Sequence, residues 1–265
     1  MAASADDLAL ALELCDVADA ITLARFGAED LVVETKPDLT PVSEADRAVE
    51  QALRGRLAAA RPGDAVIGEE YGASASAASD GRRRWIVDPI DGTKSYVRGI
   101  PVWATLLALE QDGELTLGVA SAPAIGRRWW ASRGAGAFVR EEHAPQPRRL
   151  QVSAIRELAD AHLCFAGFED WREAGRLDAL LELIARCWRT RGYGDFWQYM
   201  LVAEGAVEIG MDPTASLWDL AVPLMIVQEA GGRFTDRAGR VTADGGDAIA
   251  TNGLLHDATL AFLGR

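Results

Sequence analysis

The sequence has little cysteine and little histidine, with three residues of each among 265. Cys15, Cys164 and Cys187 are far apart and lie in apolar surroundings, so we expect buried free thiols and no redox chemistry. The histidines show no metal-ligand spacing, which argues against a zinc site. The chain is rich in acids instead, and hard divalent cations take oxygen ligands.

Long apolar runs and clusters of basic residues are also missing. No stretch of about 18 apolar residues could span a bilayer, and the first residues lack the basic and then apolar plan of a signal peptide. A formal net charge of -13 argues against nucleic-acid binding, which needs Lys and Arg facing phosphates. We therefore expect a cytoplasmic protein that binds neither nucleic acid nor a membrane.

No repeat, Pro-rich linker or long low-complexity stretch divides the chain. Its 265 residues are enough for one large domain or two closely packed halves. We expect a single unit with halves of about 1–150 and 151–265. Residues 73–84 are small and then basic, which is typical of a mobile surface loop.

The apolar pattern changes between helical and strand periods along the chain. Helices are predicted at about 7–25, 43–61, 177–188, 196–204, 217–230 and 255–263. Strands are predicted at 65–67, 85–87, 163–166, 206–210, near 234 and at 248–251, with an antiparallel meander over 102–138. This alternation indicates a layered α/β architecture with sheets buried between helices.

The most informative run is an apolar strand that ends in Asp88-Pro89-Ile90-Asp91-Gly92-Thr93. Its two aspartates lie on either side of a proline that fixes the backbone. If a helix starts near Gly92, its free N–H groups point to the same place as the two carboxylates and form an anion site. Taken alone, such a run is more often an ordinary turn with an N-cap.

Further acids strengthen the case for a metal site. Glu69 follows a buried β run, so it emerges at the end of a strand, where ligands of layered α/β folds collect. Glu70 beside it is expected to be solvated. Asp219 opens a helix and Asp46 is the third residue of another behind Ser43, where dipole and capping effects alone favour an acid. Together with the central run they favour a Mg2+ site.

Three motifs in this order resemble the signatures of the inositol monophosphatase family of Mg2+-dependent, lithium-sensitive phosphatases: Glu69-Glu70, Asp88 to Thr93, and Trp218-Asp219-Leu220-Ala221. The resemblance covers nearly the whole chain, because residues 36–46 and 229–232 also match. It implies a five-layer α-β-α-β-α sandwich of the inositol monophosphatase and fructose-1,6-bisphosphatase type, commonly a homodimer.

Carried over by position, the resemblance implies two or three Mg2+ ions. One ion would be held by Glu69, Asp88 and the backbone carbonyl of Ile90. A second would be held by Asp88, Asp91 and Asp219. A third, weaker ion would contact Glu69 through water.

The same resemblance assigns the catalytic groups. Thr93 and Glu69, with Asp46 behind them, would orient a metal-activated water for attack on phosphorus. Asp91 and the backbone N–H groups of Gly92 and Thr93 would hold the phosphate. No covalent phosphoenzyme is required.

Two acids of the second half indicate a substrate that carries a positive charge. Asp195 lies where family members that take inositol phosphates have small residues, and Asp212 falls on the family's substrate-binding acid. Two carboxylates beside a phosphate site favour a zwitterion. Histidinol phosphate fits, and residues 35–42, 98–104 and 193–196 are similar to the histidinol-phosphatase branch of the family.

Three other residues have two interpretations each. Arg191 could contact the ligand or the pocket acids, or form a surface salt bridge. Asn252 could donate to the imidazole, although an Asn-Gly turn explains it nearly as well. Trp103 could be a pocket wall for a flat ring or a core residue.

The sequence therefore predicts a Mg2+-dependent phosphomonoesterase that hydrolyses L-histidinol phosphate, a small phosphate ester of histidine biosynthesis, to L-histidinol and phosphate. Inositol-1-phosphate or a 3'(2'),5'-bisphosphate nucleotide is the alternative substrate. A different class also stays open, a protein-binding partner in transcription whose phosphatase site is incidental.

Overall fold

The computed structural model describes residues 4–37, 39–73 and 82–263. These residues form two compact units, and each is described by itself. Unit 1 comprises Met1–Gly134 and Val139–Pro147, and unit 2 comprises Ala135–Phe138 and Arg148–Arg265. Most of the loop predicted at 73–84 lies outside the described residues, but its ends belong to strands.

Two long helices of unit 1 begin at serine caps. In α1 (Ala5–Arg25) the Ser4 side chain accepts from the backbone of Asp7, whose carboxylate accepts from Ser4 in return. Ser43 and Asp46 form the same capping box at α2 (Glu44–Ala60). Each box satisfies backbone donors that the first turn of a helix leaves without partners. Both predicted helices are confirmed.

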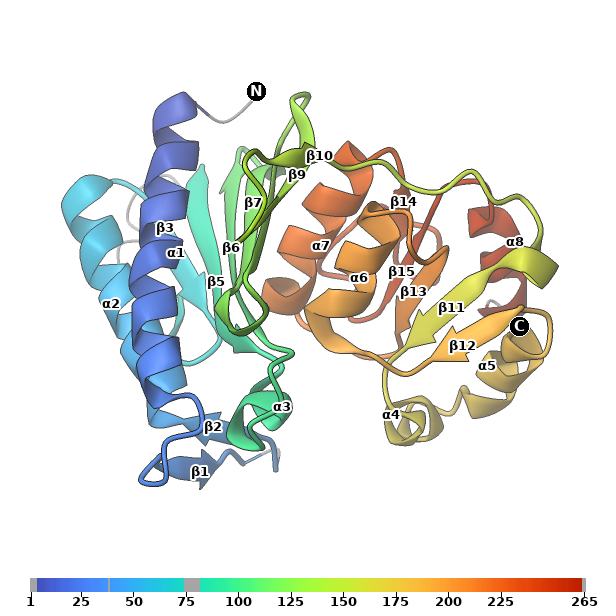
Figure 1. The fold of residues 1–265 in the computed structure, drawn as a ribbon, viewed down its shortest axis with the longest axis horizontal. Coiled ribbons are helices and arrows are strands. Elements are labelled where there is room, and N and C mark those ends of the chain that lie inside the picture. The colour runs from blue at the N-terminus through green and yellow to red at the C-terminus, as the bar shows by residue number, and fades with distance from the viewer. Residues whose placement is uncertain (1–3, 38, 74–81, 264–265) are drawn as a thin grey trace. The chain divides into compact units, whose positions relative to one another are not determined.

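The larger sheet has the strand order β10-β9-β8-β7-β6-β5-β3-β4. Strands β3 and β5 are parallel, whereas β5 to β8 pair antiparallel, as the predicted meander requires. Apolar residues of α1 and α2, such as Leu14 and Leu53, pack on this sheet beside Trp85 and Leu107 (Figure 1). The elements other than α1 and α2 are β1 (Val33–Thr35), β2 (Pro41–Ser43), β3 (Ala65–Gly68), β4 (Gly72–Ala73), β5 (Arg83–Asp91), α3 (Thr93–Val97), β6 (Ala104–Gln111), β7 (Glu114–Ala122), β8 (Arg127–Ser132), β9 (Gly136–Glu141) and β10 (Arg148–Arg149).

Unit 2 has a mixed sheet with the order β12-β11-β13-β15-β14. The first three strands are parallel, and β13, β15 and β14 pair antiparallel. Helices α4, α5 and α8 cover one face and α6 and α7 the other (Figure 1). These elements are β11 (His162–Phe165), α4 (Phe168–Glu173), α5 (Leu177–Ile184), β12 (Arg189–Arg191), α6 (Asp195–Ala203), β13 (Ile209–Asp212), α7 (Leu217–Glu229), β14 (Arg233–Thr235), β15 (Ala248–Thr251) and α8 (His256–Leu263).

The predicted pattern of unit 2 needs three corrections. The helix expected over 177–188 ends at Ile184, because the following residues turn and pair as β12 with β11. Helix α4 was not predicted, and β13 begins at Ile209 rather than at residue 206. In each case tertiary pairing overrides a weak local preference.

Two composition-based expectations can be checked directly. Cys15 and Cys164 are buried free thiols, and Cys187 is free and half-buried. No helix among residues 4–37, 39–73 and 82–263 is long and apolar enough to cross a membrane.

Candidate metal and phosphate site

A β-bulge places two aspartates on the same face of strand β5. Asp88 pairs with Leu106 and Asp91 pairs with Ala104, so three steps along β5 match two steps along β6. Side chains alternate between faces along a strand, and residues three apart would otherwise point to opposite faces. The extra residue of the bulge corrects this, and Asp88 and Asp91 are both buried.

The loop after Asp88 is fixed by hydrogen bonds and by packing. The Ile90 N–H donates to Asp88 Oδ1 over 3.0 Å, and Thr93 Oγ1 donates to the Ile90 carbonyl over 2.9 Å. The Ile90 side chain lies in a buried cluster with Tyr96 and Trp103. The core interpretation of Trp103 is therefore the correct one.

A short helix begins where the sequence predicts it. Gly92 is the N-cap of α3 with a φ of 85°, a backbone conformation that glycine adopts without strain. Its carbonyl accepts the N–H groups of Ser95 and Tyr96. The first turn of α3 thus follows directly on Asp91.

Asp46 caps α2 and also contacts Thr93. Its Oδ2 accepts from the Ser43 N–H and hydroxyl, over 2.8 and 2.5 Å, while Oδ1 lies 3.3 Å from Thr93 Oγ1. Burial raises the pKa of Asp46, the Glu69 charge raises it further, and the Ser43 hydrogen bonds oppose the shift. The capping acid of α2 therefore also contacts the candidate catalytic threonine.

Glu69 and Glu70 share one cation. The Lys36 ammonium lies 2.7 Å from Glu69 Oε1 and 2.6 Å from Glu70 Oε1. Burial alone would lower the pKa of Lys36, but the two glutamates outweigh this and raise it. The prediction that Glu70 is solvated was wrong, since its side chain is 5% exposed and bound to Lys36.

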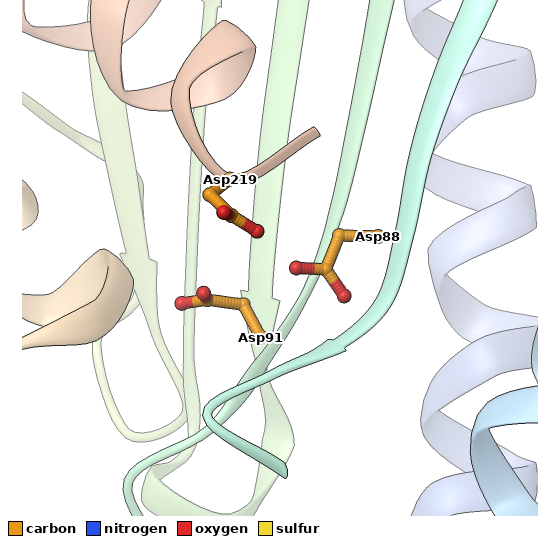
Figure 2. Close-up of side chains that lie close together, drawn as sticks. All are labelled: Asp88, Asp91 and Asp219. Atoms are coloured by element: carbon orange, nitrogen blue, oxygen red, sulfur yellow. The ribbon is translucent and has the colours of Figure 1, made fainter. Parts of the chain in front are cut away.

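Asp219 is the third residue of α7, and its Oδ2 accepts from the Ser216 N–H over 2.7 Å in a capping box. Among the described residues, Asp88, Asp91 and Asp219 form a group whose ligand oxygens all lie within 4.8 Å of one another (Figure 2). Such an all-oxygen set suits a hard divalent cation. Like charges this close repel each other unless a cation or proton joins them.

Asp212 and Asp195 are two acids of unit 2, and the charge of Asp195 affects the pKa of Asp212. Asp212 Oδ2 accepts from Tyr199 Oη and Gln198 Nε2, each over 2.6 Å. The pKa of Asp212 is raised to about 7, chiefly by burial. The charges of Asp195 and Asp219 contribute to the rise, and the hydrogen bonds from Tyr199 and Gln198 oppose it. Asp195 starts α6 with a φ of 49°, a conformation that is uncommon outside glycine.

The last two candidates make contacts of an ordinary structural kind. Asn252 is buried; its amide donates to Ser153 Oγ and the Ile155 carbonyl, and its Oδ1 accepts two N–H groups of the next turn. This favours the turn interpretation of Asn252. Arg191 is exposed on β12 and donates to the Thr190 carbonyl.

Sequence reasoning missed the partners of these acids. Tyr199 and Gln198 were treated only as helix residues, and Lys36 only as part of a motif. Glu50 was also missed, although its position on α2 gives a signal. It lies between Val49 and Leu53 of the buried stripe, where a charged residue must be paired.

The model of the inositol monophosphatase family matches residues 5–263. The chain belongs to this family. A histidinol-phosphatase of Mycobacterium tuberculosis is 54% identical over 260 residues, covering 98% of both chains. One of Streptomyces coelicolor is 53% identical, covering 98% of this chain and 97% of the other.

A solved structure has the same fold. It is the extragenic suppressor protein suhB of Bartonella henselae, with a TM-score of 0.89 and 28% identity over 98% of this chain and 99% of that one. The predicted family and the layered α/β fold class are therefore confirmed. The protein is a phosphatase.

Proposed function

We propose that this phosphatase hydrolyses L-histidinol phosphate to L-histidinol and phosphate with Mg2+ as cofactor, in histidine biosynthesis. One observation carries the substrate: relatives 53–54% identical over 98% of the chain are histidinol-phosphatases. The acids described above support the same substrate from the chemistry of the site.

The donor set fits Mg2+. Asp88, Asp91 and Asp219 offer carboxylate oxygens within 4.8 Å of one another, and Glu69 and the Ile90 carbonyl would add further oxygens. Bound Mg2+ would supply a Lewis acid that activates water and neutralises charge on the phosphate. We propose two or three ions in this region.

The chain's own groups would position the reactants. Thr93 Oγ1 donates its proton to the Ile90 carbonyl or to Asp46, so its oxygen would accept a hydrogen bond from the attacking water in a fixed direction. Glu69 would be the general base near that water. The backbone N–H groups of Gly92 and Thr93 would donate hydrogen bonds to the phosphate oxygens beside Asp91.

Specificity would come from Asp195 and Asp212. A carboxylate attracts the ammonium of histidinol phosphate, and a neutral polyol gains nothing from this charge. Arg191 and Asn252 remain predicted substrate contacts, of which Asn252 has the weaker case. The homodimer stays a prediction that light scattering of the purified protein can test.

Inositol-1-phosphate is the second candidate, and a specific observation favours it. Burial raises the pKa of Asp212 to about 7, which weakens its attraction for a cation at neutral pH. The hydroxyl and amide beside it, from Tyr199 and Gln198, are also suitable partners for a polyol.

The test is phosphate release from histidinol phosphate, inositol-1-phosphate, adenosine 3',5'-bisphosphate and fructose-1,6-bisphosphate, each with Mg2+ and with a chelator. We expect the highest kcat/KM for histidinol phosphate and loss of activity with the chelator. A higher kcat/KM for inositol-1-phosphate would replace the substrate assignment. Full activity in the chelator would remove the metal.

A further inference from the structure

Helix α2 carries a second fully buried acid one turn after Asp46. Glu50 is 0% exposed, and it takes no part in the capping box or in the contact with Thr93. A buried carboxylate is costly unless hydrogen bonds and a cation compensate it. The partners of Glu50 therefore reveal what this charge holds in place.

Glu50 binds the turn that follows strand β3. Its Oε2 accepts the Glu70 N–H over 2.7 Å, and its Oε1 accepts the Tyr71 N–H over 3.2 Å. Arg54 compensates the charge, with Nε 2.8 Å and Nη2 2.7 Å from Oε1. The same guanidinium donates to the Gly72 carbonyl and lies over the Tyr71 ring, 6.0 Å from its centroid.

Glu69 is thereby anchored on both sides. The Glu69 N–H donates to the Val87 carbonyl of β5 over 3.2 Å. The next two N–H groups, those of Glu70 and Tyr71, donate to the Glu50 carboxylate. The backbone that presents the Glu69 carboxylate is thus tied to β5 and to α2 at once.

Gly68 leaves the room that this arrangement needs. A Cβ at position 68 would lie 2.1 Å from Glu50 Oε1 and 2.3 Å from its Cδ, far inside contact distance. Gly68 does not have a positive φ. Close approach of the Glu50 carboxylate, and not backbone conformation, therefore explains glycine directly before Glu69.

We propose that Glu50 is a positioning residue: through the N–H groups of Glu70 and Tyr71 it fixes the turn that presents the Glu69 carboxylate to Mg2+. The proposal rests on the proposed function only in taking Glu69 as a metal ligand. Outer groups that orient metal ligands typically contribute 10–100-fold to metal affinity. A merely structural role would instead lower stability and leave metal affinity unchanged.

The test compares Glu50→Ala and Glu50→Gln with a matched control, Asp7→Asn. Asp7 is also a buried acid of unit 1, and it is bonded to Ser4, Arg61 and Arg83 rather than to the turn after β3. Titration calorimetry of chelator-treated protein measures Mg2+ binding without turnover, and thermal melting measures stability.

We expect Glu50→Ala to weaken Mg2+ binding by about tenfold or more. Glu50→Gln should lose less, because its amide oxygen keeps one acceptor. Asp7→Asn should lower the melting temperature and bind Mg2+ as the wild type does. Equal Mg2+ affinity in the Glu50 variants and the wild type would overturn the proposal.

Gly68→Ala gives a second route if Glu50→Ala does not fold. The added methyl should displace the Glu50 carboxylate from the Glu70 and Tyr71 N–H groups and thereby weaken Mg2+ binding. An unchanged isotherm for both Gly68→Ala and Glu50→Gln would overturn the proposal. A wild type that binds Mg2+ but leaves histidinol phosphate intact would sink only the proposed substrate.

Discussion

Three glutamates of unit 1 and Asp212 of unit 2 are held in different ways. In unit 1, Glu50, Glu69 and Glu70 are paired with the cations of Arg54 and Lys36. In unit 2, Asp212 receives its hydrogen bonds from the neutral side chains of Tyr199 and Gln198, and burial raises its pKa to about 7.

The kind of partner decides how readily the charge of a carboxylate changes. We call a charge that changes with pH or with the ligand an adjustable charge. A cation beside a buried carboxylate favours its charged form and holds it in position, and a metal ligand benefits from both effects. Neutral donors fix the position of Asp212 but leave its protonation open. We infer that Glu69 is prepared for a metal, whereas the charge of Asp212 responds to the substrate that arrives.

The largest expected effect is that of Asp88→Asn. We expect turnover of histidinol phosphate to fall at least about a thousandfold, since Asp88 would bind two ions. The folded state should be as stable as the wild type or more so without Mg2+, because one of three close negative charges is removed. Phosphate release and thermal melting in a chelator measure the two effects. Wild-type turnover would rule out the two-ion arrangement.

A charge reversal at Asp195 should change the preference between substrates more than the rate of hydrolysis itself. Asp195→Lys should reduce kcat/KM for histidinol phosphate about 10- to 100-fold more than for inositol-1-phosphate, because only the first substrate carries an ammonium. Steady-state kinetics on both substrates measure the ratio. Equal losses on both would mean that Asp195 does not recognise the cation.

Asp212→Asn tests the adjustable charge itself. The amide keeps the shape and an acceptor for Tyr199 but cannot ionise, so we expect kcat/KM for histidinol phosphate to fall about tenfold at pH 8 and less at pH 6. Kinetics at the two pH values, with inositol-1-phosphate as the control substrate, give the comparison. A loss independent of pH would assign Asp212 a structural role.

The smallest expected effect concerns pH and stability. His256 of unit 2 is buried between Thr235 and Thr251, and burial, followed by the Arg233 charge, lowers its pKa from 6.5 to about 4. The unfolded chain therefore takes up a proton first, and stability that is complete above pH 6.5 is lost as the pH falls toward 4. The melting temperature should drop by roughly 3 °C more between pH 7 and 4.5 in the wild type than in His256→Gln.

Asp7 of unit 1 supplies the control for that measurement. Burial alone would raise its pKa, but hydrogen bonds from Arg83, Ser4 and Arg61 lower it from 3.8 to about 2. Its contribution is present above pH 3.8 and is lost only as the pH falls toward 2. Asp7→Asn should therefore leave the slope between pH 7 and 4.5 unchanged.

The parts of the fold that depend on local sequence were predicted well. Helices α1 and α2 follow from serine caps and an apolar stripe, and β15 from a short buried run, because these signals lie within a few residues. Strand β12 could not be found this way. Its three residues form a strand only because β11, whose residues lie 27 positions earlier in the chain, pairs with them.

The site shows the same division. The motif around Asp88 and Asp91 was visible, but the bulge that puts both on one face depends on the pairing of β5 with β6. Glu70 was misjudged for a similar reason, since the turn that carries it is directed by Glu50 and Lys36, about 20 and 34 residues away.

The capping boxes of α2 and α7 have a consequence for how mutations in this protein should be understood. Asp46 and Asp219 start their helices together with Ser43 and Ser216, and both acids also belong to the candidate site. A substitution at Ser43 would remove the hydroxyl that donates to Asp46, a side chain that both caps α2 and contacts Thr93. Fraying of the first helical turn and slowing of the reaction would then have the same cause. Calorimetry would detect it as a loss of stability, and kinetics as a lower rate.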